Sequence, residues 1–163
     1  TYPDLVYLIV GGGASQGDLS ADLARLAASH GVADIVRLCG RQPPDELRWY
    51  YSAADVFALA TEYEGWANVF LEAMACGLPV VTTRVGGNAE VVSDTSLGTL
   101  VPYWDDAAFT TALSQALGRQ WDRELIVRHA QANAWDRRVD QLIGIFERLT
   151  AQRGMKDNMG NAA

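Results

Sequence analysis

The stretch EGWANVFLEAMACGLPVV, residues 64–81, holds the pattern that decides the fold. Apolar side chains fill residues 69–76 except at Glu72, and Gly77 closes this run. Apolar residues at helical spacing on several faces predict a helix that is largely buried. The residues that follow, PVVTT at 79–83, form a short β-branched run that predicts a buried strand. A helix that passes directly into such a strand is typical of folds in which strands and helices alternate.

The same alternation continues on both sides of this stretch. Short apolar runs predict four further strands, at residues 5–10, 35–40, 55–60 and 98–101. Helical patterns lie at residues 19–27, from Pro43 onward, around Glu90, and from Asp105 to about Ala151. This order predicts an α/β fold, a Rossmann-like parallel sheet with helices on both faces. We expect one domain over residues 1–151 and a polar, flexible tail over residues 152–163.

In a parallel sheet of this kind, ligands bind at the carboxyl ends of the strands. The candidate positions are therefore the turns at residues 11–17, 40–45, 60–68, 84–90 and 102–106. The glycines at 11–13 follow a strand, as they do in dinucleotide-binding folds. They lack the full glycine spacing and a fitting acidic residue, so this motif alone is a weak indication.

Composition excludes several classes of function. The 163 residues include 13 basic and 20 acidic side chains, which give a formal charge of −7. Because no basic run is present, we expect no binding to nucleic acid or to an anionic membrane surface. No apolar run reaches the about 20 residues of a transmembrane helix, and we find no signal peptide. Cys39 and Cys76 lie in apolar surroundings without metal-ligand spacing, which fits a reducing cytoplasm.

The carboxylate of Glu72 stands among apolar neighbours and therefore needs a partner. One interpretation is a structural ion pair with an arginine. The other is that Glu72 accepts hydrogen bonds from the hydroxyl groups of a ligand. Gly65 would let the backbone approach a ligand closely, and the free amides of Asn68 and Val69 at the helix start would bind an anion. Together with Glu64, these features indicate a pocket for a nucleotide sugar.

The stretch at 64–81 resembles the C-terminal half of retaining glycosyltransferases of the GT-B fold, family 4, also called group 1 glycosyltransferases. These enzymes carry two glutamates with seven residues between them, then a small-residue helix end and a Pro-Val-Val strand. The flanking segments LIVGGG, VRLCGR, ELRWYYSAADVFALATEYEG and VGGNAEVV are also similar, over about residues 3–146. The resemblance implies a hexosyltransferase that moves a sugar from a nucleotide-diphosphate sugar to an acceptor with retention, with no cofactor and no metal.

The resemblance also implies roles for individual residues. Glu64 would be the catalytic residue and would contact hydroxyls of the donor sugar. Glu72 would hold the ribose hydroxyls, and the amides of Asn68 and Val69 would bind the diphosphate. The other donor-binding residues would be Gly12, Gly13, Arg41, Gly65, Trp66, Gly86, Gly87 and Glu90.

Two of these assignments carry further detail. The turn at residues 40–42 would lie near the base, while Glu90 has an alternative role as a cap of its own short helix. The family often has Gly-Phe-Gly after the first glutamate, where this chain has Gly65, Trp66 and Ala67. Some members with similar Trp-x-Asn runs resemble enzymes that build polysaccharides, so the resemblance implies cell-surface polysaccharide or glycoconjugate synthesis.

The family's C-terminal domain starts with an additional strand and helix before the strand at 5–10. That unit carries the arginine and lysine that neutralise the diphosphate, and we identify no clear substitute for them in this chain, although Arg41 and Arg84 lie on suitable turns. The N-terminal acceptor domain is also absent. We therefore expect the parent enzyme to be active in the cytoplasm, with a position at the inner face of the membrane left open, and the isolated chain to be inactive.

Two other hypotheses remain open at this point. The chain could be a non-catalytic nucleotide-binding subunit that completes its sheet with another polypeptide. It could also belong to a GT-B sugar-nucleotide epimerase, although the spacing of the glutamates fits family 4 better. The base, the sugar and the acceptor are not determined by the residues of this chain.

Overall fold

The computed structural model describes residues 2–12 and 18–160, and of residues 151–160 it describes the backbone. The chain forms two compact units, residues 1–50 and residues 51–163. Each unit contains parallel strands of the kind that the apolar runs predict.

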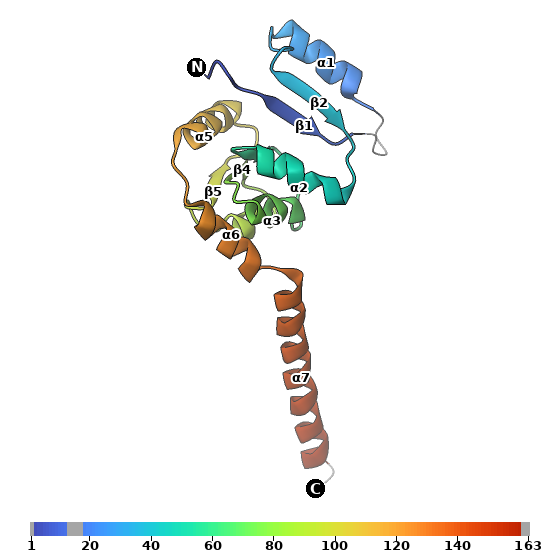
Figure 1. Ribbon diagram of the computed structural model, residues 1–163. Helices are drawn as coiled ribbons and strands as arrows, with labels where there is room; N and C mark the ends of the chain where they lie inside the picture. Colours follow the sequence, from blue (N-terminus) through green and yellow to red (C-terminus); the bar gives the residue numbers. More distant parts are fainter. Residues whose placement is uncertain (1, 13–17, 161–163) are drawn as a thin grey trace. The chain divides into compact units, whose positions relative to one another are not determined.

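The first unit is built on two strands, β1 (Tyr7–Val10) and β2 (Val36–Gly40). They pair in parallel, with Tyr7 opposite Val36 and a shift of register between Ile9 and Val10. Helix α1 (Ser20–Ser29) connects them and packs along β2 (Figure 1). Helix α2 (Pro44–Ala53) follows β2, with Asp45 and Glu46 in its first turn, where carboxylates stabilise the positive helix end.

The second unit contains a three-stranded parallel sheet in the order β3-β4-β5. Its strands are β3 (Phe57–Leu59), β4 (Val80–Thr83) and β5 (Gly98–Val101). Helix α3 (Asn68–Ala75) connects β3 to β4, and the short α4 (Asn88–Val91) lies between β4 and β5. Helices α5 (Asp106–Gly118), α6 (Arg123–Ala132) and α7 (Trp135–Gly160) complete the unit.

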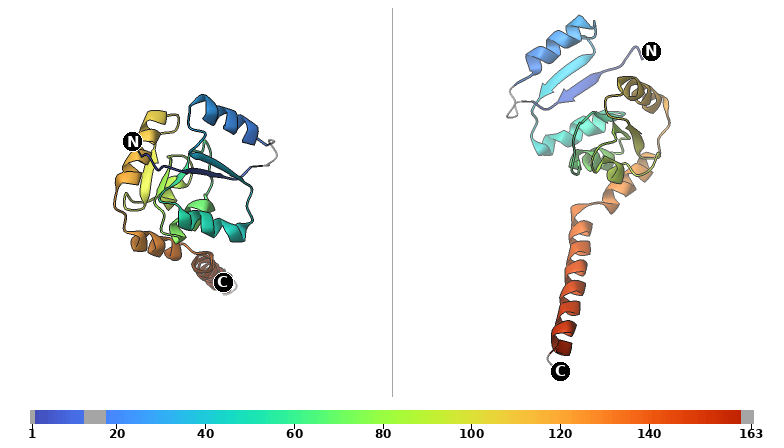
Figure 2. Two further views of the ribbon diagram at one scale, coloured as in Figure 1. Left: turned by 45° about the horizontal axis from the view of Figure 1, so that its top comes forward. Right: turned by 180° about the vertical axis from the view of Figure 1, so that it is seen from behind.

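Helices cover both faces of this sheet. Successive residues of a strand point to opposite faces, so neighbouring residues of β4 pack against different helices. Val80 packs with Phe70 of α3 and Ile126 of α6 in one fully buried cluster. Val81, the next residue of β4, packs on the other face with Ala112 and Ala116 of α5. The two views in Figure 2 show α5 and α6 in this unit from different sides. The predicted α/β class, with parallel strands between helices, is confirmed.

The structure differs from the sequence-based prediction in one respect of arrangement. The apolar runs predict a single sheet, whereas hydrogen bonds join the described strands in two parallel sheets. Helix α7 runs to Gly160, so its backbone is helical beyond the expected domain boundary at residue 151.

Within the described residues, no helix combines the length and the apolar composition that crossing a bilayer requires.

Candidate functional site

The turns that follow β3 and β4 are tied together by side chains of β4. Thr83 Oγ1 donates to the carbonyl of Thr61 at 2.6 Å and accepts from the amide of Thr61 at 3.1 Å. Thr82 Oγ1 donates to the carbonyl of Leu59 at 2.7 Å. Asn88, which is fully buried, donates through Nδ2 to the carbonyl of Thr83 at 2.9 Å. These bonds fix the carboxyl ends of two neighbouring strands relative to each other.

Beyond these bonds, the glycine turn after β4 lies directly against the backbone that carries Glu64. The amide of Gly87 donates to the carbonyl of Glu64 at 3.3 Å. A Cβ atom at Gly86 would collide with the carbonyl of Glu64, and one at Gly87 would collide with the carbonyl of Gly65. Gly86 also has a φ of +45°, which glycine adopts at little cost. Both positions therefore require glycine, because the two backbones approach closely. This contact brings together four predicted site residues, namely Glu64, Gly65, Gly86 and Gly87.

Helix α3 starts next to this contact and presents free backbone donors. Ala67 is its N-cap, with φ −80° and ψ 94°, and no side chain caps it. The amide of Phe70 donates to the carbonyl of Ala67 at 3.1 Å. The amides of Asn68 and Val69 have no hydrogen-bond partner in the described parts of the chain. A helix start of this kind can bind an anion such as a phosphate group.

Glu72 lies one turn into α3, and its surroundings differ from the dry environment that its apolar neighbours predict. The helix packs through the fully buried Phe70, Ala73 and Met74, which leaves Glu72 on the exposed side. Its Oε2 accepts a hydrogen bond of 3.1 Å from the hydroxyl of Tyr51. Burial, and then the charge of Glu72, raises the pKa of Tyr51, so this hydroxyl keeps its proton and donates. Among the described residues, no arginine forms the alternative ion pair with Glu72.

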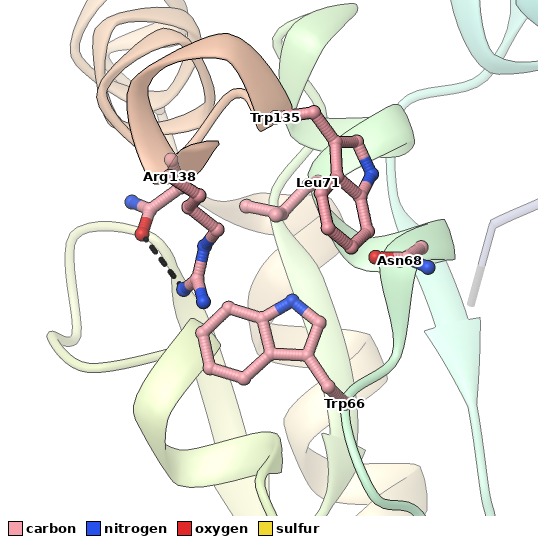
Figure 3. Close-up of a pocket in the computed structure, with 6 residues that line it drawn as sticks. Trp66, Asn68, Leu71, Trp135 and Arg138 are labelled. Atoms are coloured by element: carbon pink, nitrogen blue, oxygen red, sulfur yellow. Dashed lines mark hydrogen bonds between the residues drawn. The ribbon is translucent and has the colours of Figure 1, made fainter. Parts of the chain in front are cut away.

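A pocket of about 310 Å³ opens beside the start of α3. Figure 3 shows the guanidinium of Arg138 over the ring of Trp66, with Trp135 and Leu71 across from them. The Arg138 carbon Cζ lies 3.9 Å from the centre of the Trp66 ring, a cation–π contact. The pocket is lined by Trp66, Asn68, Leu71, Asn133, Trp135 and Arg138.

Sequence reasoning identified Trp66 and Asn68 but missed the part of this pocket that comes from α7. Arg138 has a weak contact of 3.5 Å from Nη2 to Asn133 Oδ1, and its Nε has no partner among the described residues. Trp135 is an exposed aromatic residue at the first position of its helix. Trp135 and Arg138 are three residues apart and share one helical face, but nothing in the local sequence indicates that this face meets Trp66.

The remaining predicted residues are placed separately. Gly12 and Arg41 belong to the first unit, where both are exposed, and Gly13 lies outside the described residues. Glu90 is exposed in the first turn of α4. In the described ranges, no three His, Cys, Asp or Glu side chains are grouped as a metal site would require.

This geometry can be set beside known proteins. The model of the family described as glycosyl transferases group 1 matches residues 1–119. The D-inositol 3-phosphate glycosyltransferase of Acidothermus cellulolyticus is 37% identical over 150 residues, which cover 90% of this chain and 34% of that protein. The protein of the same name from Saccharomonospora viridis is 38% identical over 156 residues, or 92% of this chain and 36% of that protein.

Solved structures share the fold. Sucrose-phosphate synthase from Thermosynechococcus elongatus is 30% identical with a TM-score of 0.73, over 89% of this chain and 38% of that chain. A similarity in fold alone, at 24% identity and a TM-score of 0.72, links 92% of this chain to 42% of HepE from Anabaena, whose structure is in complex with UDP.

The parallel sheets and their flanking helices are those of the GT-B glycosyltransferases. The chain belongs to the group 1 glycosyltransferases and corresponds to their C-terminal domain. It spans about a third of the length of the curated relatives that it matches.

Proposed function

We propose that this chain is the donor-binding part of a glycosyltransferase that uses a nucleotide-diphosphate sugar. The observation that carries the proposal is the contact between the Gly86–Gly87 turn and the backbone of Glu64 and Gly65, beside the open start of α3. That contact holds the backbone of Glu64 against the glycine turn, which supports the proposal. A nucleotide sugar offers the hydroxyls and phosphates that a carboxylate and free amides bind.

In this proposal, each group acts on a different part of the donor. Glu64 contacts hydroxyls of the sugar, and Glu72 accepts from the ribose hydroxyls. The amides of Asn68 and Val69 stabilise the diphosphate as it departs. The protein thus accelerates transfer mainly by positioning the donor and by stabilising the charge of the leaving group.

The finer features of the activity are part of the same proposal. We propose that a hexose is transferred with retention, in the synthesis of a cell-surface polysaccharide or glycoconjugate, and that no cofactor is required besides the donor. We place the enzyme in the cytoplasm because its two cysteines form no disulfide framework. Because the chain spans a third of its relatives, we propose that it binds the donor but transfers no sugar by itself.

A matched pair of variants at Asn68 tests the amide site. Asn68 is the first residue of α3, a position that tolerates proline because its amide makes no helical bond. The extended backbone of Ala67 is also compatible with a following proline. Asn68→Pro therefore removes one amide hydrogen while it keeps the helix, and Asn68→Ala keeps the amide and removes the side chain.

Calorimetric titration with UDP, GDP and ADP measures the effect. We expect one nucleotide to bind, Asn68→Pro to weaken binding by about 1.5–3 kcal/mol, the value of a hydrogen bond to a charged group, and Asn68→Ala to bind nearly as the original chain does. Equal affinities of the two variants would show that the start of α3 does not bind the diphosphate.

A further inference from the structure

Two aromatic residues after β5 form a feature that the donor site does not use. Tyr103 and Trp104 follow Val101, the last residue of that strand, and their ring centres lie 4.6 Å apart in a tilted arrangement. Trp104 is 80% exposed. We call this pair the aromatic platform. An exposed pair of adjacent aromatic rings is a candidate for ligand binding, because covering a tryptophan ring contributes strongly to binding.

The backbone conformation of Trp104 is a second unusual feature of this residue. Its φ is +64°, and Trp104 is the only residue other than glycine with a positive φ in the described ranges. A bulky side chain in this conformation costs free energy that glycine would avoid. Among the described residues, the indole of Trp104 belongs to neither buried cluster, so no core packing offsets this cost. The position therefore favours a role for the side chain outside the fold.

The aromatic platform is connected to the turn after β3. Burial, followed by the charge of Glu62, raises the pKa of Tyr103, so the carboxylate of Glu62 lies near the hydroxyl of Tyr103. Glu62 lies two residues before Glu64, and β3 and β5 flank β4 in one parallel sheet. Their carboxyl ends therefore share one edge, so the platform and the proposed donor-sugar contact lie at the same edge of the sheet.

The aromatic platform and Glu62 together provide the groups that recognise a sugar ring. A pyranose ring has an apolar face of C–H groups that packs on the electron-rich face of an aromatic ring. Its rim carries hydroxyls that donate to carboxylates, and Glu62 supplies one. The rings of Tyr103 and Trp104 would lose little side-chain entropy on binding, because each has only two rotatable side-chain bonds.

We propose that the aromatic platform, with Glu62, binds a pyranose ring of the acceptor glycan. The inference rests on the proposed function, since it places a second sugar at the edge where the donor sugar is expected. The high exposure of Trp104 favours a glycan that approaches from solvent over the sugar of a nucleotide held at the start of α3.

The test follows the indole N–H signals of the chain in a proton–nitrogen NMR spectrum while maltotriose or mannotriose is added. Every pyranose has an apolar face, so stacking should tolerate the difference between these two probes. We expect the Trp104 signal to shift at millimolar trisaccharide. The indole of Trp49, which is 59% exposed and does not line the pocket beside α3, serves as an internal control, and its signal should not shift.

The variant Trp104→Gly assigns the signal and separates binding from folding. Glycine accepts the positive φ, so we expect an equal or higher Tm together with loss of the trisaccharide shift at the amides of Glu62 and Tyr103. Glu62→Gln should weaken the shift severalfold, because an amide oxygen is a poorer acceptor than a carboxylate.

Titration of the same sample with UDP keeps the two proposals apart. Shifts at Asn68 and Val69 without a trisaccharide response at Trp104 would overturn the platform and leave the donor site standing. A trisaccharide response at Trp104 without any nucleotide response would support the platform and overturn the donor site. Equal shifts at Trp49 and Trp104 would show non-specific contact and would also overturn the platform.

Discussion

At the scale of the residue, one hydrogen bond orients the carboxylate of Glu72, which we propose accepts from the ribose hydroxyls. The hydroxyl of Tyr51 donates to Glu72 at 3.1 Å, and the ring of Tyr51 packs against Phe57 with centres 5.7 Å apart. The bond leaves the other oxygen of Glu72 open to accept from a ligand. Tyr51 therefore orients the carboxylate, while its half-buried ring packs against Phe57.

We predict that Glu72→Ala weakens nucleotide binding by about 1.5–3 kcal/mol, because it removes a charged acceptor. The free energy of unfolding should change by less than about 0.5 kcal/mol, since the side chain is exposed. Calorimetry and urea unfolding measure the two quantities. Glu124→Ala is the control, because Glu124 is 91% exposed on α6. A large loss of stability in Glu72→Ala would instead indicate a structural role.

Tyr51→Phe tests the orienting bond without disturbing the ring. We expect a smaller loss of nucleotide affinity than in Glu72→Ala, and no further loss when both substitutions are combined, because the hydroxyl acts through the carboxylate. Tyr50→Phe, on the same helix, controls for removal of a hydroxyl. Additive losses in the double variant would mean that Tyr51 and Glu72 contact the nucleotide independently.

The raised pKa of Tyr51 also predicts a pH dependence. Folding favours the protonated phenol, so the stabilisation is present below the ordinary pKa of 10.0 and is lost as pH rises above it toward the folded-state pKa. The difference in unfolding free energy between the original chain and Tyr51→Phe should therefore shrink as pH rises above about 10. A difference that stays constant would show that the hydroxyl's pKa is not linked to folding.

At the scale of the element, the contact between the turns after β3 and β4 depends on glycines, because these have no side chain. Gly87→Ala should place a methyl group against the carbonyl of Gly65 and destabilise the fold by about 1–3 kcal/mol. Gly65→Ala is the matched control, because a Cβ there meets no atom within 4 Å. Thermal unfolding compares the two. Equal Tm values would show that the turns do not approach as closely as the structure has them.

Most elements could be predicted from the sequence because their signals are local. The strand at 79–83 was expected from its β-branched residues and occurs as β4, Val80–Thr83. The helix expected from the apolar run at residues 69–76, which Gly77 closes, occurs as α3, Asn68–Ala75. Such patterns depend on neighbours in the chain, so they are visible without knowledge of the packing.

The exposure of Glu72 and the composition of the pocket could not be predicted in this way. The apolar residues around Glu72 predicted burial, but α3 packs by one face only, and this is a tertiary choice. Arg138 reaches Trp66 from 72 positions along the chain, and no local pattern indicates that contact. The approach of Gly87 to Gly65 is also tertiary, although the glycine turn itself was recognised from the family pattern.

At the scale of the whole molecule, the proposed function concerns an acidic chain that must bind an acidic ligand. The formal charge is −7, so long-range electrostatics oppose a nucleotide diphosphate. Local donors must overcome this repulsion, and the start of α3 is the group of donors on which the proposal relies. We therefore predict that nucleotide affinity rises with moderate salt, because salt screens the net charge more than the close contacts. A steep fall with salt would point to a cationic site instead.

The most direct test of donor binding is an amide-resolved NMR titration of this chain with UDP, GDP and ADP in turn. We expect a dispersed spectrum in which one nucleotide shifts the amides at residues 64–72 and 86–90, with the largest shifts at Asn68 and Val69. A dispersed spectrum in which none of the three nucleotides shifts these amides would contradict the proposal that this chain binds the donor.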